Sequence, residues 1–485
     1  MAEIGQLTST LIARAVTTKA GLAWGVLALA LAAAAALWLW PFTVDDALIS
    51  IRYARHLALG FGYRFNVGGP HTDGVTPLPW PFVLWLLAHA EPLVVLARAK
   101  ALGLAAWLVT ACTLGTVIGR CDGPRLAKVA ALVGLGVCVP LAVHAVSGME
   151  TAIATSLATT AALLHQRPRL AAVFAGLAAS FRPEMLPWAL VLATAFHPSL
   201  SGRAVALLLA SFPFVACAVA RLVAFGSPAP LSLVAKPSDL AHGFAYAGAA
   251  ALASVGPLMA FAPVAAARER GPGRAIALAG GVHLLAVAVA GGDWMPFARL
   301  VVPIVPSLLY ASVLFWPCSR RWAAWGRAVV AIGLGLRVLV LAGPAARNVG
   351  PDREGLARRV GPLLVGRQRV AAVDIGWVSA ATEADIIDLA GVTDPDVAAL
   401  GGGHTSKRID ASFLLAERPD AFVLYAEASD LALDRWADAF FPRVVEARLA
   451  RSPLVEAHFA AVAFVPLGAT GTGYYVLFPG GDSLF

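Results

Sequence analysis

The sequence contains few charged residues. Asp, Glu, Lys and Arg make up 14% of its 485 residues, compared with about a quarter of an average soluble domain. Hydrophobic residues make up 59%, and the mean hydropathy is +0.75. A single water-soluble core cannot hide that much apolar surface. The composition therefore excludes a soluble enzyme and a disordered protein, and it favours a polytopic membrane protein.

Cysteine is also scarce. There are five cysteines, all before residue 350 and in or beside apolar runs. This pattern excludes a disulfide scaffold, and the cysteines do not have the spacing of metal ligands. The histidines and acidic residues likewise form no cluster with metal-ligand spacing. We therefore predict no obligatory metal cofactor.

Charge divides the chain into two parts. Residues 1–349 contain 25 basic and 11 acidic residues, whereas residues 350–485 contain 12 basic and 18 acidic residues. The basic excess is typical of membrane loops and does not indicate a nucleic-acid partner. We therefore predict a membrane domain over 1–349 and a separate, more polar domain over 350–485.

The apolar runs predict a bundle of membrane-spanning helices. The first run, 21–40, follows Arg14 and Lys19 and has no cleavage site after it, which predicts a signal anchor with a cytoplasmic N-terminus. The later runs are 93–119, 126–146, 149–165, 170–181, 184–197, 203–225, 244–266, 274–290, 299–316 and 322–342. The basic connectors are 120–128, 165–169, 197–203, 267–274 and 317–327. All of these connectors lie inside if there are eleven spans, and the C-terminal domain then lies outside.

Two further segments complete the predicted fold. Residues 78–90 are too few to cross a membrane, so we expect a helix at the outer interface. Within 350–485, strand-like runs (VAAVDI, IIDLAGV, AFVLYA, YYVLF) alternate with helix-like runs (SFLLAERP, LALDRWADAFF). The predicted fold is therefore mainly α, a polytopic helical bundle with a C-terminal extracytoplasmic α/β domain.

Most acidic residues of the membrane domain fall on one side of this topology. The eight expected at the outer face are Asp45, Asp46, Asp73, Glu91, Glu150, Glu184, Asp239 and Asp293. The basic residues expected there include Arg52, Arg55, Arg182, Lys236 and Arg299. Charges near membrane spans are costly and suggest function. Their convergence predicts a polar cavity for a charged or polyhydroxyl substrate.

The first outer loop, 41–77, carries an acidic pair. Asp45 and Asp46 directly follow the first span, and 46–59 has the spacing of an imperfectly amphipathic helix lying on the membrane surface. Two adjacent carboxylates beside lipid would have perturbed ionisation, so one could act as a general base. The alternative is that the pair only caps a helix at the membrane exit.

This loop resembles the GT-C superfamily of integral-membrane glycosyltransferases. The resemblance is strongest to the terminal β-arabinofuranosyltransferase-like enzymes of the mycobacterial cell wall, in DDALISIRYARHLALGFGYRFNVGG and DGVTPLPW. Further matches are SGMET (147–151), FRPEML (181–186), PLSLVAK (230–236), GGDWMPFARLVVPIVP (291–306) and DLAGVTDP (388–395). The sequence departs from the family pattern at Asp73, where Glu is usual, at the inserted Pro79, and at Met185, which replaces Gly.

The resemblance implies an activity. Such enzymes transfer a sugar from a polyprenyl-phosphate donor to a glycan, glycolipid or protein acceptor at the outer face of the bacterial inner membrane. Inverting transfer needs a carboxylate base and cations for the leaving phosphate. Asp45 and Asp46 are equal candidates for the base. A weakly bound divalent cation bridging Asp46 and the phosphate is left open.

The remaining candidates would bind substrate. The donor-phosphate candidates are Arg182, Lys236 and Arg299, with Arg52 behind them. The candidates for other substrate contacts are Asp293, Trp294, Glu150, Glu184, Asp73 and His56.

Each of these residues also has a structural interpretation. Arg182 could pair with Glu184, Arg299 could anchor the topology, and Lys236 could lie in a solvated loop. Trp294 could belong to an interfacial aromatic belt, Glu150 could cap a helix, and His56 could be structural. In the C-terminal domain, Asp374, Trp377, Asp388 and Asp394 could bind a polymeric acceptor, but Asp388 and Asp394 are better explained as turn caps.

Two other functions compete with the transferase. A transporter or flippase for lipid-linked sugars also predicts a polytopic fold with buried charges. However, transporters tend to place their charges near the midplane and to contain inverted repeats, and no repeat is evident here. A non-catalytic scaffold gives no reason for an acidic pair beside basic loops.

Overall fold

The computed structural model describes residues 19–254, 256–260, 262–269, 271–427, 432–468 and 471–480. Arg14, which helped to predict the cytoplasmic N-terminus, lies outside the described residues. The chain divides into two compact units. The described residues of the helical unit lie within Met1–Phe42, Ala99–Cys217 and Ser238–Arg347. The described residues of the mixed unit lie within Thr43–Arg98, Ala218–Pro237 and Asn348–Phe485, so the first outer loop clusters with the C-terminal part of the chain.

The chain is mainly helical, with 67% of it in helices. Among the described residues, five helices are long and apolar enough to cross a membrane, or up to seven segments if each of two bent helix pairs is one span. The long helices are α2 (Lys19–Trp38), α5 (Pro92–Arg120), α11 (Leu200–Phe225), α16 (Pro272–Val289) and α18 (Arg321–Val360). The bent pairs are α6 (Arg125–Val137) with α7 (Val139–Ala145), and α13 (Leu240–Ala253) with α14 (Gly256–Met259) and α15 (Ala262–Arg268). These helices are compatible with a multi-pass membrane protein.

The other apolar runs form shorter elements. They are α8 (Thr151–Leu163), α9 (Pro168–Phe181), η1 (Pro183–Met185), α10 (Leu186–Ala195), η2 (Val302–Ile304), α17 (Val305–Phe315) and η3 (Trp316–Cys318). The run over 170–197 breaks at Arg182, whose backbone is extended, because Pro183 disfavours helical geometry in the residue before it. The break places the charged side chain of Arg182 between two apolar helices.

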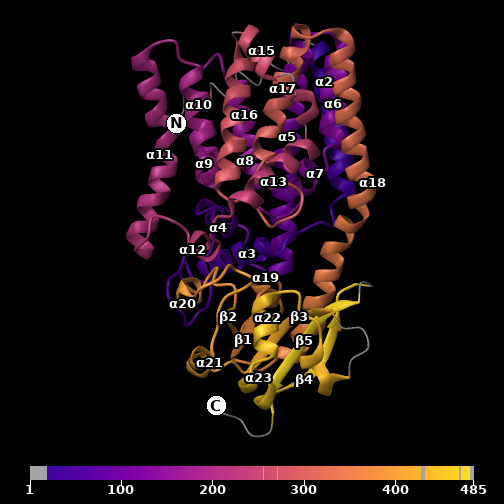
Figure 1. Ribbon diagram of the computed structural model, residues 1–485. Helices are drawn as coiled ribbons and strands as arrows, with labels where there is room; N and C mark the ends of the chain where they lie inside the picture. Colours follow the sequence, from indigo (N-terminus) through magenta and orange to yellow (C-terminus); the bar gives the residue numbers. More distant parts are fainter. Residues whose placement is uncertain are drawn as a thin grey trace. The chain divides into compact units, whose positions relative to one another are not determined.

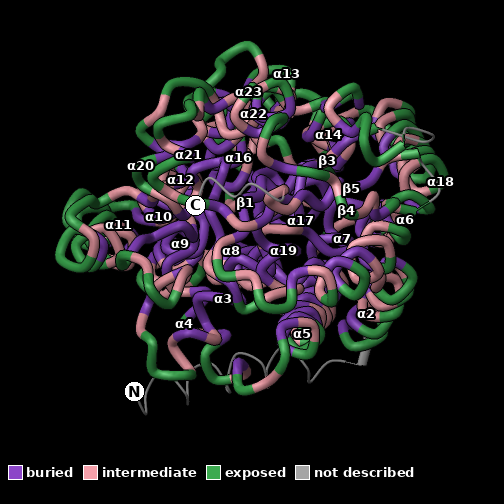
Figure 2. Tube along the Cα trace, turned by 90° about the horizontal axis from the view of Figure 1, so that it is seen from below, coloured by how far each residue is buried: buried purple, intermediate pink, exposed green. Residues whose placement is uncertain are grey.

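Small residues let the helices of the helical unit approach closely. A Cβ atom on Gly115 of α5 would lie 2.6 Å from the carbonyl oxygen of Trp24 on α2, so only glycine fits there. The core of this unit is rich in alanine and contains the buried indoles of Trp107 and Trp188. In Figure 2 the tube is mainly purple along α8 and α9 and largely green along α11 and α18, as expected for apolar helices that face lipid.

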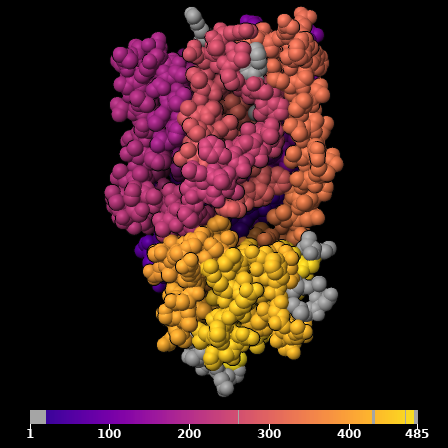
Figure 3. Space-filling model, viewed as in Figure 1, coloured from indigo at the N-terminus to yellow at the C-terminus, as the bar shows by residue number. Residues whose placement is uncertain are grey.

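The mixed unit is built on a five-stranded sheet of order β2-β1-β3-β5-β4 (Figure 1). The strands are β1 (Arg369–Ala372), β2 (Asp385–Asp388), β3 (Ala421–Glu427), β4 (Phe459–Pro466) and β5 (Thr472–Pro479). β1 pairs in parallel with β2 and β3, whereas β5 pairs antiparallel with β3 and β4. One face packs against α22 (Val444–Ala450) and α23 (Pro453–His458). In Figure 3 the C-terminal residues, coloured orange to yellow, form one continuous surface.

The remaining elements of the mixed unit are short. They are α3 (Asp45–Ala58), α4 (Pro79–Trp85), α12 (Leu231–Ala235), η4 (Gly361–Leu364), α19 (Ile375–Ala381), α20 (Pro395–Ala399), α21 (Ala411–Glu417) and η5 (Leu433–Asp438). The helix predicted over 46–59 is confirmed as α3, and all four strand-like runs form strands. The sequence reading missed β4, and the run LALDRWADAFF forms only the 3-10 helix η5.

Candidate functional site

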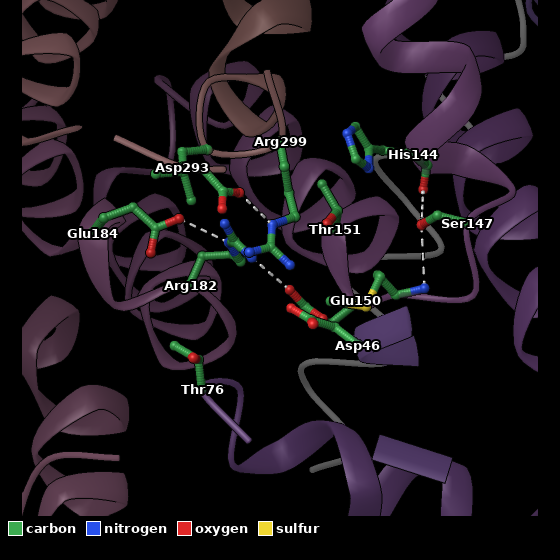
Figure 4. A network of polar contacts seen from close by, with 12 residues as sticks. Asp46, Thr76, His144, Ser147, Glu150, Thr151, Arg182, Glu184, Asp293 and Arg299 are labelled. Atoms are coloured by element: carbon green, nitrogen blue, oxygen red, sulfur yellow. Dashed lines mark hydrogen bonds and ion pairs between the residues drawn. The ribbon is translucent and has the colours of Figure 1, made fainter. Parts of the chain in front are cut away.

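Charged side chains gather between apolar helices in the helical unit (Figure 4). Arg182 donates from Nη1 to Glu150 Oε1 and from Nε to Glu184 Oε1, both at 2.8 Å. Arg299 donates from Nε to Asp293 Oδ2 at 2.8 Å. The two arginines are close enough for their charges to repel. The structure thus brings together five of the predicted site residues from three separate segments.

Burial makes this cluster energetically demanding. The Glu150 side chain is 0% exposed and the Arg182 side chain 3% exposed. A buried ion pair gains little net stability, because removing both charges from water costs several kcal/mol per ion. Nη2 of Arg182 makes no hydrogen bond within the described ranges. A guanidinium with a remaining donor can accept an anionic ligand.

A tight turn places Glu150 in the cluster. The motif SGMET connects α7 to α8, and Gly148 in it has a φ of 84°, which favours glycine. Ser147 Oγ accepts a hydrogen bond from the Met149 amide at 3.2 Å and fixes the turn. Glu150 is the N-cap residue of α8, but its side chain makes no cap hydrogen bond. Its carboxylate contacts Arg182 instead, so the helix-capping interpretation is wrong for this side chain.

A strained loop carries Asp293 and Arg299. Phe297 and Ala298 both have positive φ, 64° and 56°, immediately before Arg299. Such backbone costs about 1–3 kcal/mol per residue and persists only where surrounding structure enforces it. His144 Nε2 lies 3.2 Å from the Phe297 carbonyl oxygen and supplies part of that support. The sequence reading missed His144, although a histidine inside an apolar run is itself a signal.

The acidic pair lies in the first turn of α3, in the mixed unit. Val44 is the N-cap residue of α3 and no side chain caps this helix, so neither aspartate caps it. The Asp45 carboxylate instead accepts the amide protons of Gly376 and Trp377, at 3.0 and 2.8 Å, from the first turn of α19. Burial and the nearby Asp374 carboxylate raise the pKa of Asp45 to about 7.

Asp374 is the centre of a buried charge network next to this contact. It accepts hydrogen bonds from Arg443 at 2.9 Å, from Arg353 at 3.3 Å and from the Tyr474 hydroxyl. The two arginines hold the pKa of Asp374 below its ordinary value despite its burial. Three side chains thus hydrogen-bond to the Asp374 carboxylate, which favours a structural role for Asp374 over acceptor binding.

Arg52 and His56 are committed to the backbone. The Arg52 guanidinium donates to four carbonyl oxygens, those of Phe65, Ser379, Thr382 and Ala384, at 2.7–3.3 Å. Four of its five N–H donors are therefore used, which disfavours Arg52 as a phosphate ligand in this arrangement. His56 Nδ1 lies 2.9 Å from the Arg64 carbonyl oxygen, which agrees with its structural interpretation.

Asp73 is held by a partner that the sequence reading missed. Its Oδ2 accepts a hydrogen bond from Arg221 Nε at 2.5 Å, and its Oδ1 accepts one from the Tyr63 hydroxyl at 3.1 Å. Arg221 also donates to the carbonyls of Val75 and Thr76. This buried ion pair fixes the DGVTPLPW turn. The signal was an arginine inside the apolar run 203–225, away from its charged start at Arg203.

The other candidates are more accessible. Lys236 is half-buried after α12, and within the described part of the chain its Nζ forms no hydrogen bond or ion pair. Trp294 is 66% exposed and stacks on His242 with ring centroids 4.1 Å apart. An exposed indole beside a carboxylate can stack on a sugar ring, so Trp294 stays a candidate for substrate binding. Lys236 stays a candidate for the donor phosphate because its ammonium group has no partner among the described residues.

The C-terminal candidates divide differently. Asp388 accepts three backbone amide protons from residues 390–393, and Asp394 accepts those of Asp396 and Val397 at the start of α20. Their interpretation as turn caps is confirmed. Trp377 is only 2% exposed, so its ring offers no surface to a ligand.

No metal site is evident in the described ranges. No group of three or more His, Cys, Asp or Glu side chains there could hold a metal ion. None of the five cysteines forms a disulfide.

Comparison with known proteins adds one finding. A family model described as "Domain of unknown function (DUF8728)" matches residues 356–478, which include the sheet of the mixed unit except the last residue of β5. No curated protein and no solved structure matches the chain.

Proposed function

We propose that this protein is a GT-C-type glycosyltransferase with eleven membrane spans, resembling the mycobacterial terminal β-arabinofuranosyltransferases. It transfers a sugar from a polyprenyl-phosphate donor to a glycan, glycolipid or protein acceptor. The reaction takes place at the outer face of the bacterial inner membrane, with the N-terminus in the cytoplasm and the C-terminal residues outside.

The observation that carries this proposal is the buried cluster of Arg182 and Arg299 among apolar helices. Ionised groups in such surroundings are expensive, and a membrane protein that retains them generally uses them. Arg182 keeps Nη2 available while Glu150 and Glu184 orient its other donors. A guanidinium oriented in this way suits the phosphate of a lipid-linked sugar, whose negative charge grows as the glycosidic bond breaks.

An apolar groove in the same unit supports a lipid donor. It has a volume of about 380 Å³ and lies between α5 and α8, lined by residues that include Leu102, Val109, Ile153 and Leu157. The same helix α8 follows directly after Glu150 of the charge cluster. A ligand with an anionic head and a long apolar tail matches this combination of charge and groove.

Asp46 is the better candidate for the base. Both oxygens of Asp45 accept backbone amide protons, which makes Asp45 a positioning residue in this proposal. The Asp46 carboxylate takes the proton of the acceptor hydroxyl. The hydroxyl oxygen bonds to the anomeric carbon from the face opposite the phosphate. The bond from that carbon to the phosphate oxygen breaks, and the polyprenyl phosphate leaves with the electron pair and the negative charge.

Paired substitutions test the proposal. Asn keeps the size of Asp but cannot take the proton, so Asp46→Asn should lower transfer from a synthetic polyprenyl-phosphate sugar by on the order of 10²-fold or more. Asp45→Asn keeps one acceptor for the α19 amides and should lose less. Asp396→Asn, at an exposed aspartate, is the matched control. Near-wild-type turnover in Asp46→Asn would refute this assignment of the base, and no transfer by the wild-type protein with a panel of sugars would refute the function.

A further inference from the structure

Two side chains of α3 form hydrogen bonds with the two ends of α19 in the mixed unit. Asp45 accepts the amide protons at the start of α19, and Arg52 donates to the carbonyls of Ser379, Thr382 and Ala384 at its end. Amides at the start of a helix and carbonyls at its end have no partner within the helix. An anionic side chain at the start of α19 and a cationic side chain at its end also match the helix dipole.

The spacing along α3 matches the length of α19. Asp45 and Arg52 are seven residues apart, two helical turns on one face of α3, or about 10 Å along its axis. Helix α19 is itself seven residues long. The two helices therefore run side by side in the same direction, and the two charged side chains close both ends of the contact.

The contact leaves no room for a side chain at residue 376. A Cβ atom added to Gly376 would lie 2.1 Å from the Asp45 carbonyl oxygen and 2.8 Å from its Oδ1. The φ of Gly376 is not in the left-handed region. The requirement for glycine is thus close approach of the two backbones.

The start of α19 is itself anchored to the sheet. Asp374, its N-cap residue, is held by Arg443, which precedes α22, and by Tyr474 on β5. Arg353 in the last part of α18 also contacts it. The amides that hold Asp45 therefore follow closely after a residue whose carboxylate is hydrogen-bonded to three other segments of the mixed unit.

We propose that α19 positions the acidic pair. In this proposal Gly376, Asp45 and Arg52 fix the rotation of α3 about its axis and its position along that axis. Neighbouring residues on a helix point about 100° apart, so with Asp45 held by α19 the direction of Asp46 is set by the same contact. The matched domain of residues 356–478 thus takes part in catalysis without touching the reacting atoms. This inference rests on the proposed function.

The experiment compares Gly376→Ala with Gly401→Ala, a control glycine whose added Cβ would meet only Arg408 Cδ at 3.7 Å. Hydrogen exchange of peptides from α3 and steady-state transfer are measured on each purified full-length protein. Gly376→Ala should speed exchange in α3 and lower kcat by about 10-fold or more with little change in the donor KM, because small displacements of a catalytic group are costly.

A second variant covers failure of the first to fold. Arg52→Lys keeps the charge at the end of α19 but loses most of the donors, and it should give a smaller fall in kcat with the same faster exchange in α3. Equal exchange of α3, or equal kcat, in wild type and both variants overturns the inference. Failure of the proposed function would look different, since the wild-type protein itself would then transfer no sugar.

Discussion

Removal of the Arg182 charge separates its structural from its functional role. Arg182 Nη1 is the partner of Glu150 Oε1, and Glu150 Oε2 has no hydrogen-bond partner in the described structure. Arg182→Met keeps an unbranched apolar stem, shorter than that of arginine, and leaves the fully buried Glu150 carboxylate without its ion-pair partner. Breaking a buried pair in this way costs about 3–5 kcal/mol. The variant should therefore unfold at a clearly lower temperature than wild type.

A double variant restores stability without restoring binding. In Arg182→Met with Glu150→Gln the buried charge is gone from both positions, so most of the lost stability should return. The affinity for a polyprenyl monophosphate should stay weaker by about 10- to 150-fold, because one charge-assisted hydrogen bond contributes about 1.5–3 kcal/mol. Arg169→Met, at an exposed arginine in α9, is the control and should change neither quantity.

The assay measures melting temperature and polyprenyl monophosphate binding on the same detergent-purified samples. Only variants that elute as wild type in size exclusion are used for binding. If the double variant is stable and binds the phosphate as tightly as wild type, Arg182 serves only to neutralise Glu150. The role of Arg182 at the donor phosphate would then be refuted.

Two further predictions concern pH and topology. Burial raises the pKa of Glu446 from 4.5 to about 8 and that of Asp45 from 3.8 to about 7, so the folded state holds these protons more tightly and its stability should fall as pH rises from about 4 to about 8. Glu446→Gln should reduce the fall in melting temperature between about pH 4 and about pH 8. An unchanged fall would contradict a raised pKa of Glu446 as its cause. A cysteine at position 410 should react with an impermeant label from outside and one at position 322 should not, in a background without the native cysteines; the reverse result would overturn the proposed orientation.

The local pattern of the sequence was sufficient to predict much of the fold. Long apolar runs specify membrane-compatible helices because the backbone must satisfy its own hydrogen bonds in lipid. The spacing of residues 46–59 predicted α3, and the β-branched and aromatic runs after residue 369 predicted four of the five strands. Such signals depend only on neighbours in the chain. The predicted eleven spans exceed the five to seven segments of the described residues that are long and apolar enough to cross a membrane. A short apolar run such as 170–181 does not by itself show how the chain bends after it.

Only the tertiary structure distinguished the roles of similar charges. Asp45 and Asp46 are equivalent in sequence, but the amides that occupy Asp45 come from residues more than 300 positions away. Arg52 also has partners more than 300 positions away. It donates to the carbonyls of Ser379, Thr382 and Ala384, and this disfavours its predicted role as a phosphate ligand. Arg182 met Glu150 as well as the expected Glu184. The role of a charged side chain depends on the partner that neutralises it. That partner can come from a segment distant in sequence, and the sequence alone does not show which distant segments pack together.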